Sequence, residues 1–441
     1  MDFTMLSRIQ FGFTIGFQYL FAVSTLGLSL YILVFEALYV IRKEEVCRDI
    51  TDFLVKILTL VFTFGVATGF MMPAAFGANW SRFSSFAGPV FGIHLAMEGT
   101  TAFALEAVSL AVLLFGRNRI SARLYLASAF VVFFAAHLSA FWIVSANSWM
   151  QTPAGFAIED GRMVLTSLFH AVFNPSAPIR IVHVIIASWI TGSAVVAGIA
   201  AYYLLKNLHV QFSTVLLSRT IVPFFCFALL QLFVGHFHVL GVLAHSPVKE
   251  AAYEGIFQTT NGAPLYAFGI PDEKNGRIHC AIGLPYMLSF LETGRFDAEV
   301  KGLNDYPKED WPPVNVIFTT FHLMCMCGMS FILIGLIGVF LLYKKRLFES
   351  RWYLFILLCT IPLTYLANQL GWIGTEIGRQ PWMIYQIQKT SDAATTSIPA
   401  AHAVVSLSFI ACFYLVLAII FLKQLATIIN KGPRITERRE A

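Results

Sequence analysis

The sequence predicts an all-α fold, a polytopic membrane helix bundle of about nine transmembrane helices in a single membrane domain, residues 1–441. Only 12% of the residues are charged and 57% are hydrophobic, whereas a soluble domain carries about 25% charged residues. Nine apolar runs are long enough to cross a bilayer, which takes about 20 residues as a helix. The net charge of +5 is small and scattered, so a nucleic-acid partner is not expected.

The nine runs share high hydrophobicity and are bounded by polar connections; they are roughly 11–41, 52–77, 92–115, 122–147, 179–205, 217–243, 313–343, 352–374 and 399–428. No basic segment with a small-residue cleavage site precedes the first run, so it is expected to be a retained span rather than a signal peptide. One long connection, 244–312, is polar and rich in proline. It is predicted to be an extramembrane loop between the sixth and seventh helices.

Lysine and arginine predict the orientation, because they are enriched in short cytoplasmic connections. They concentrate after the first, third and seventh runs and in the C-terminal tail: Arg42, Lys43, Arg48, Arg117, Arg119, Arg123, Lys344, Lys345, Arg346, Arg351, Lys431, Arg434, Arg438 and Arg439. The C-terminus is therefore predicted to be cytoplasmic and the N-terminus external. The loop 244–312 is then external too.

Ionisable and sulfur-containing side chains inside the runs are the candidate functional residues, because a charge within a bilayer is costly. Those near the predicted outer ends of different runs are His94, Glu98, Glu106, His183, His322, Met324, Glu376 and Arg379, with Lys249 and Glu254 at the start of the long loop. Each has a structural alternative: an interhelical strut for a histidine, a brace for a glutamate, core packing for the methionine. Their convergence on one side of the membrane favours a site.

The residue types suggest what that site does. A methionine thioether and a neutral imidazole are an axial pair for haem iron. The seven cysteines form no C-x-x-C pair and predict neither disulfides nor a thiolate-held metal. Glu98 and Glu106 are about 80° apart around an ideal helix and could face one proton channel. Lys249 and Glu254 could hold and deprotonate a hydroxylated ring.

Several segments resemble subunit I of the cytochrome bd-type quinol oxidases. They are Leu6-Ser7-Arg8-Ile9-Gln10-Phe11, Gly65-Val66-Ala67-Thr68-Gly69, Gly77-Ala78-Asn79-Trp80, Leu138-Ser139-Ala140, Ala146-Asn147-Ser148-Trp149-Met150-Gln151 and Gly371-Trp372-Ile373-Gly374-Thr375-Glu376-Ile377-Gly378-Arg379-Gln380-Pro381-Trp382. The last is the most specific. The long loop is short for the family, so the chain resembles its short-loop branch.

The resemblance implies roles for individual residues. His183 and Met324 match the axial ligands of the low-spin haem b558. Glu376 matches the ligand of haem b595, with Arg379 beside it and Trp372 of the same segment as a further cofactor-binding candidate. Glu98 and Glu106 match the carboxylates of the proton path and oxygen site, and Lys249 and Glu254 match the quinol-binding pair of the external loop.

The implied function is that of a haem-bearing subunit of a quinol:oxygen oxidoreductase in the bacterial cytoplasmic (inner) membrane. It would oxidise quinol at the outer face and reduce oxygen to water with cytoplasmic protons, which generates proton motive force. The implied cofactors are haem b558, haem b595 and either haem d or a third haem b. The implied partners are subunit II, in a membrane heterodimer, and small single-span subunits.

The chain departs from the family pattern at five places. A histidine that ligates a haem of the oxygen site is replaced by Gln18, and a Glu-Phe-Gln segment is replaced by Pro73-Ala74-Ala75. His322 replaces an arginine, His94 a proline and His236 an aspartate. An amide oxygen is a poor haem ligand, so ligation of the third haem is open.

Three interpretations of the oxygen site stay open: His94 replaces the lost ligand, Gln18 holds a water on the iron, or Glu98 ligates the haem. In the last two cases His94 would be a structural strut. The roles of His236, His238 and His322 stay open. The alternative function is a bd-like quinol-linked electron-transfer subunit with an altered or absent oxygen site. A structural paralogue is disfavoured, because a structural remnant has no reason to retain ligands on separate helices.

Overall fold

The computed structural model describes residues 2–434, and within this range nine helices are long and apolar enough to cross a membrane. Their elements are α1 (Phe3–Arg42), α2 with α3 (Glu45–Gly69, Met71–Ala78), α4, a π-helix and α5 (Ser81–Met97, Glu98–Phe103, Ala104–Gly116), α6 (Ala122–Gln151), α8 (Ala177–Leu205), α9 (Val210–His245), α12 (Val314–Tyr343), α13 (Arg351–Ile377) and α15 (Ala400–Lys431). All nine predicted spans are confirmed. Arg438 and Arg439, used for the orientation, lie outside the described residues.

Several helices extend beyond the apolar runs because capping and polar packing, rather than hydropathy, decide where helical backbone ends. The first helix begins at Phe3, eight residues before the predicted run. The Asp2 side chain caps it by accepting a hydrogen bond from the backbone N–H of Met5 at 2.9 Å.

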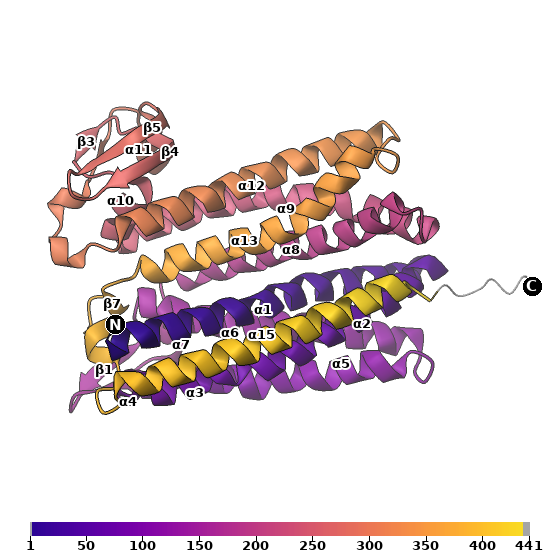
Figure 1. Cartoon of the computed structure of the whole chain (residues 1–441), viewed down its shortest axis with the longest axis horizontal. Helices are drawn as coiled ribbons and strands as arrows, with labels where there is room; N and C mark the ends of the chain where they lie inside the picture. The colour runs from indigo at the N-terminus through magenta and orange to yellow at the C-terminus, as the bar shows by residue number, and fades with distance from the viewer. Residues whose placement is uncertain (1, 435–441) are drawn as a thin grey trace, which may run out of the picture.

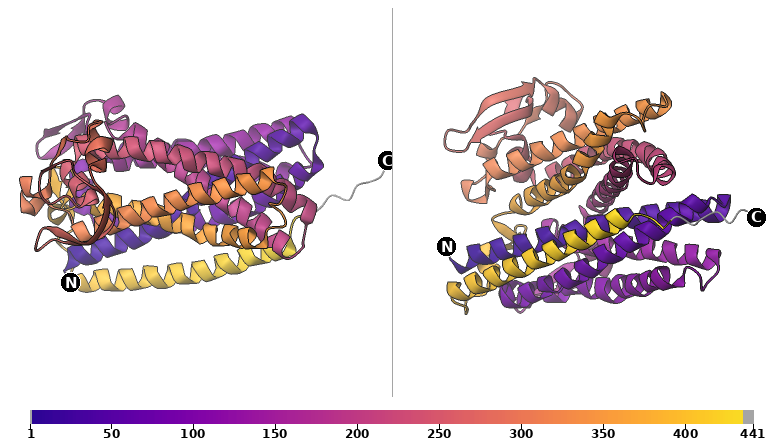
Figure 2. Two further views of the ribbon diagram at one scale, coloured as in Figure 1. Left: turned by 90° about the horizontal axis from the view of Figure 1, so that it is seen from above. Right: turned by 45° about the vertical axis from the view of Figure 1, so that its right-hand side comes forward.

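Helices α1 and α8 form the centre of the bundle (Figure 1). α1 contacts α2, α6, α8 and α15, and α8 contacts α6, α9 and α13. α12 packs on both α9 and α13, so α8, α9, α12 and α13 make a four-helix group beside α1 (Figure 2).

The two central helices meet at a pair of glycines, Gly27 on α1 and Gly192 on α8. A Cβ atom built on Gly27 would lie 2.5 Å from the Gly192 Cα atom and 2.6 Å from the Ser188 carbonyl oxygen. Neither backbone can yield without moving a helix. Small residues at such crossings let membrane helices approach closely, where van der Waals packing drives association.

We expect Gly27→Ala to lower the free energy of unfolding by about 1–3 kcal/mol, because the methyl group meets backbone atoms rather than a mobile side chain. The measurement is the thermal unfolding midpoint of the detergent-purified protein. Gly92→Ala is the matched control, since a Cβ at Gly92 meets nothing within 4 Å. An equal midpoint for both variants would contradict a tight crossing at Gly27.

The N-terminus and the connection between α9 and α12 lie at the same end of the bundle, called here the loop end, and the C-terminal helix finishes at the opposite end (Figure 1). This agrees with the predicted placement of the N-terminus and the long loop on one side of the membrane.

The connection between α9 and α12 is folded rather than irregular, which the sequence analysis did not predict. It contains α10 (Pro247–Glu254), β3 (Thr260–Asn261), β4 (Leu265–Asp272), β5 (Arg277–Leu284), α11 (Met287–Thr293), β6 (Glu299–Val300) and two short 3₁₀ turns. β4 pairs with β5 and β3 with β6, both antiparallel. Two further small hairpins lie at the loop end. The first pairs β1 (Phe156–Glu159) with β2 (Arg162–Leu165) and is followed by α7 (Leu168–Val172). The second pairs β7 (Trp382–Ile384) with β8 (Gln388–Lys389) and is followed by α14 (Thr390–Ala393).

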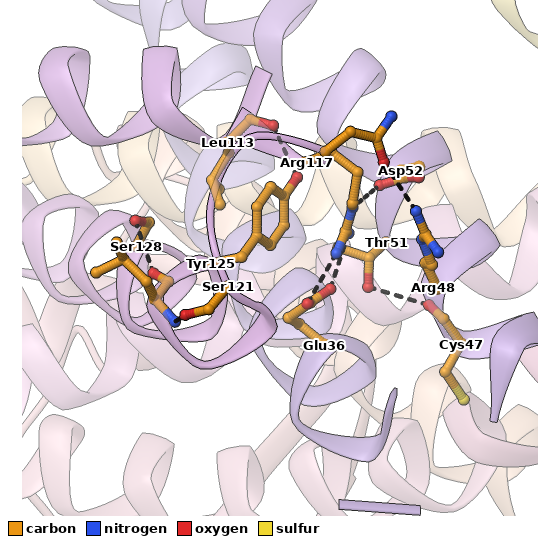
Figure 3. A network of polar contacts seen from close by, with 12 residues as sticks. Glu36, Cys47, Arg48, Thr51, Asp52, Leu113, Arg117, Ser121, Tyr125 and Ser128 are labelled. Carbon is orange, nitrogen blue, oxygen red and sulfur yellow. Dashed lines mark hydrogen bonds and ion pairs between the residues drawn. The ribbon is translucent and has the colours of Figure 1, made fainter. Parts of the chain in front are cut away.

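A polar network closes the opposite end of the bundle (Figure 3). Arg117 donates two hydrogen bonds of 2.8 Å to the carboxylate of Glu36, which is fully buried. Its Nε donates to Asp52 at 2.5 Å, and its guanidinium carbon lies 3.6 Å from the ring centroid of Tyr125. The network joins α1, α2, α5 and α6 where a bare charge would otherwise face hydrocarbon.

Candidate functional site

A single large cavity of about 2030 Å³ brings together side chains from eight of the helices in the described part of the chain. Ordinary ligand pockets measure about 300–1,000 Å³, so this cavity has room for more than one large group. The predicted site residues that line it are Gln18, Glu98, Glu106, His183, Lys249, Glu254, Met324, Trp372, Glu376 and Arg379, together with His236, His238 and His322. His94 does not line it.

His183 and Met324 reach the cavity from α8 and α12 of the four-helix group. Within residues 2–434 neither ring nitrogen of His183 has a hydrogen-bond partner, and its Nδ1 is buried. The Met324 sulfur lies against Gly371 of α13, where a Cβ would approach it to 2.8 Å. An unpartnered imidazole and an accessible thioether are what an iron-binding pair requires.

The glycines of the segment 371–382 make one face of α13. Gly371, Gly374 and Gly378 follow the i, i+3, i+7 spacing of a helix face. A Cβ at Gly374 would lie 3.4 Å from the Tyr253 ring, and one at Gly378 would lie 2.8 Å from Lys249 Cε. The glycines therefore let Met324, Tyr253 and Lys249 pack directly on the α13 backbone.

Glu376 is held at the end of α13 by hydrogen bonds to both carboxylate oxygens. Asn147 donates to Oε1 at 2.8 Å and Arg379 donates to Oε2 at 2.5 Å. Arg180 donates to Asn147 Oδ1 from α8. One nitrogen of Arg180 and one of Arg379 are buried without a partner in the described structure.

Lys249 adds a third basic side chain to this cluster. Its Nζ donates to the Thr375 carbonyl oxygen at 3.0 Å and lies 3.3 Å from Gln151 Oε1. Burial, and after it the charge of Arg180, holds the pKa of Lys249 well below its ordinary value. Arg180 and Arg379 thus remain the cations near Glu376, and their unused N–H groups suit a bound anion such as the propionates of haem.

Arg180 is the main site residue that the sequence analysis did not identify. It lies 7% exposed on the first turn of α8 and faces the cavity. The available signal was its spacing: Arg180 precedes His183 by three residues, so the two share a helix face.

Glu98 and Glu106 both face the cavity, from the π-helix and from α5. Ser139 donates to Glu98 Oε1 at 2.7 Å, while Glu106 Oε1 is buried without a partner among residues 2–434. The π-helix changes the rotation between them, and such insertions are frequent at functional sites.

Gln18 lines the cavity, but its amide is engaged with α2. Thr68 donates a hydrogen bond to Gln18 Oε1, and a Cβ at Gly69 would lie 3.3 Å from Gln18 Nε2. The adjacent Tyr19 stacks on Trp372 with ring centroids 5.9 Å apart. The oxygen atom that would face an iron is therefore used in helix packing.

The other histidines have separate surroundings. His94 is fully buried, with Nδ1 3.3 Å from the Val90 carbonyl oxygen, which favours the strut over the ligand. His322 places its two nitrogens 2.9 Å and 2.8 Å from the carbonyl oxygens of Phe318 and Tyr266, which ties α12 to β4. His238 packs edge-on against His183, with ring centroids 4.9 Å apart.

Glu254 reaches the cavity from the loop end and is 3% exposed. Burial, followed by the charge of Glu292, raises its pKa to about 8. Glu254 and Lys249 form no ion pair within the described residues, because five positions on a helix place them about 140° apart. The predicted quinol pair therefore lines one cavity from two sides.

Nine membrane-spanning helices in the described residues, eight of which line one large cavity with ionisable side chains in its wall, define a polytopic membrane protein with room for large cofactors. The chain belongs to the cytochrome bd terminal oxidase subunit I family, whose model matches residues 6–433. The resemblance seen in the sequence is thereby confirmed, and the chain is a multi-pass protein of the bacterial inner membrane. Membership implies haem cofactors, other subunits and a place in respiratory electron transport.

Individual relatives agree in length and shape. The chain is 33% identical to cytochrome bd ubiquinol oxidase subunit 1 of Bacillus subtilis, over 98% of this chain and 94% of the relative. It is 30% identical to cytochrome bd-II ubiquinol oxidase subunit 1 of Escherichia coli, over 98% and 97%. The bd oxidase structure from Geobacillus thermodenitrificans superposes with a TM-score of 0.92, at 29% identity, covering 98% of this chain and 99% of that one.

Proposed function

We propose that this chain is the haem-bearing subunit of a quinol oxidase that oxidises membrane quinol at the loop end and passes the electrons to oxygen. The observation that carries the proposal is the single cavity in the described structure that joins an unpartnered His183, Met324 and the Glu376 cluster to Lys249 and Glu254. The relatives named above are ubiquinol oxidase subunits, and another from Bacillus subtilis, 34% identical, is a putative menaquinol oxidase subunit.

The residues present fit haem. His183 and Met324 would be the axial ligands of haem b558, and Glu376 would ligate haem b595. Arg180 and Arg379 would neutralise propionates, and Trp372, stacked on Tyr19, offers a flat apolar wall. The bound haems, with haem d or a third haem b in the oxygen site, supply one-electron transfer between quinol and oxygen.

The chain itself moves the protons. Glu254 would accept the proton of a quinol hydroxyl, and Lys249 would orient the ring from the opposite side. Glu98 and Glu106 would carry protons from the cytoplasm to the oxygen site. With the loop end outside, quinol protons leave on one side and oxygen takes protons from the other, which generates proton motive force.

The complex would include subunit II as a membrane partner, with small single-span subunits. The test uses the complex purified in detergent with its native partners. Quinol-dependent oxygen uptake and a reduced-minus-oxidised spectrum with a low-spin b-type signal are expected. A complex that contains haem but consumes no oxygen with any quinol would contradict the oxidase.

A second candidate function is quinol-linked electron transfer with an altered oxygen site. One observation favours it: the Gln18 amide is hydrogen-bonded to Thr68, and His94 does not line the cavity. A red chlorin band of haem d in the spectrum would favour the oxidase, and its absence together with absent oxygen uptake would favour this alternative.

We expect Gln18→His to shift the high-spin haem spectrum and to change carbon monoxide binding, because an imidazole is a far better iron ligand than an amide that is already engaged. Gln18→Asn is the control, since it keeps the amide and adds no ligand. A Gln18→His variant with parental haem content, spectrum and oxygen uptake would show that position 18 does not face an iron.

A further inference from the structure

Three carboxylates meet at the loop end, beyond the membrane-spanning segments. Glu250 and Glu254 are four residues apart on α10 and therefore share one face of that helix. Glu292 lies on α11, which follows the β4–β5 hairpin in the chain. Glu254 and Glu292 line the cavity, whereas Glu250 lies behind them.

The carboxyl groups of Glu250 and Glu292 lie close enough to interact directly. Two neighbouring carboxylates disfavour each other's ionised form, which favours one proton held between the pair. Glu250 is 1% exposed, and one oxygen atom of each of the three glutamates is buried without a partner in residues 2–434. These oxygens can accept a proton.

No basic side chain in the described structure forms an ion pair with any of the three. Lys249, on the same short helix, points instead to Thr375 and Gln151. Burial first, and then the neighbouring acids, raises the pKa of Glu250 well above its ordinary value, and burial also raises the pKa of Glu292. Protonation, rather than an ion pair with a basic side chain, therefore limits the negative charge of these three carboxylates.

We propose that Glu292 and Glu250 form the exit relay that takes protons from Glu254 to the water at the loop end. The proposal rests on the proposed function, in which Glu254 receives the quinol proton. Glu254 lies at the cavity wall, 3% exposed, and Glu292 is only partly buried, so the order Glu254, Glu292, water runs from the cavity outward.

Each step balances. One quinol O–H bond breaks, its proton binds the Glu254 carboxylate, and one electron would pass by way of the bound haems to oxygen; the second O–H bond repeats the step. Glu254 then passes a proton to the unpartnered oxygen of Glu292, and the Glu250–Glu292 pair releases one proton to water. Glu250 keeps the shared proton within the pair, so a second negative charge is never left in the buried position.

The test measures the whole oxidase, with Glu292→Gln, Glu250→Gln and Glu292→Asp, against Glu309→Gln as an exposed acid of the same loop. Quinol-dependent oxygen uptake gives kcat and KM in H₂O and in D₂O. Oxygen uptake with tetramethyl-p-phenylenediamine, which donates electrons without releasing protons, bypasses the relay.

For Glu292→Gln and Glu250→Gln we expect kcat with quinol to fall about tenfold or more, in the lower range of proton-transfer effects. KM, the haem spectrum and the rate of oxygen uptake with the diamine should stay near parental values in both variants. The solvent isotope effect on kcat should rise. Glu292→Asp, which keeps a carboxylate, should recover part of kcat. Glu309→Gln should behave as the parent.

Parental kcat in both glutamine variants would overturn the relay, as would equal losses with quinol and diamine, which indicate a structural defect. If the complex with Glu292→Gln does not assemble, the kcat of the Glu250→Gln variant alone tests the relay. Parental quinol turnover in Glu254→Gln overturns Glu254 as the acceptor of the quinol proton and the relay with it, whereas a parental complex that consumes no oxygen with quinol overturns the proposed function itself. Impaired Glu254→Gln with normal relay variants overturns only the relay.

Discussion

Replacing His183 by alanine, or Met324 by leucine, is expected to abolish the low-spin haem signal of the purified complex. Each change removes one of the two side chains that would hold this haem. His238 is the neighbouring imidazole, with its ring centroid 4.9 Å from that of His183.

The measurement is the reduced-minus-oxidised spectrum together with haem content after extraction. Met326→Leu is the matched control, because Met326 is on the same helix and is 54% exposed. The control should retain the parental spectrum. A six-coordinate low-spin spectrum in both His183→Ala and Met324→Leu would refute this ligand pair.

Glu254→Gln is expected to lower quinol-dependent kcat by about 100-fold or more, because an amide cannot accept the proton that a general base removes. The parental enzyme should show its own pH dependence. Burial and Glu292 raise the pKa of Glu254 to about 8, so the accepting carboxylate forms as the pH rises through that value. Quinol turnover should therefore increase from pH 7 to pH 9 in the parent and lose this rise in the variant.

Haem content should be unchanged in Glu254→Gln, since its carboxylate faces the loop end and Glu292 rather than the Glu376 cluster. Glu299→Gln, an exposed acid of the same loop, is the control. Lys249→Ala is a less selective probe, because Lys249 bonds the Thr375 carbonyl beside Glu376 and its loss should disturb a haem as well. A Glu254→Gln variant with parental turnover and pH profile would refute its role as the base.

The transmembrane architecture could be predicted because it depends on local composition. Nine apolar runs imply nine helices, since backbone N–H and C=O groups in hydrocarbon must be satisfied within each segment. The helix ends and the folded loop could not be read in this way. The β3–β6 pairing of Thr260 with Val300 and the closeness of Glu292 to α10 depend on residues that are distant in sequence.

Most of the site could be predicted as a set of residues, and ten of the eleven predicted site residues line the cavity. The segment 371–382 is the clearest case, because its glycines, spaced on one helix face, are visible in the sequence alone. His94 is the exception. It is one turn from Glu98, yet α4 is rotated so that its imidazole is buried away from the cavity.

By itself, then, the sequence determined the nine-helix membrane fold, the family and the ligand candidates, because these follow from hydrophobic length and from residue types in local motifs. Only the tertiary structure decided that Gln18 is bonded to Thr68, that Arg180 and Lys249 lie with Arg379 near Glu376, and that Glu292 lies beside Glu250. The physical reason is helix rotation and packing. Whether a side chain faces a cavity, a neighbouring backbone or another charge is set by the helices packed against it, which lie tens to hundreds of residues away in the chain.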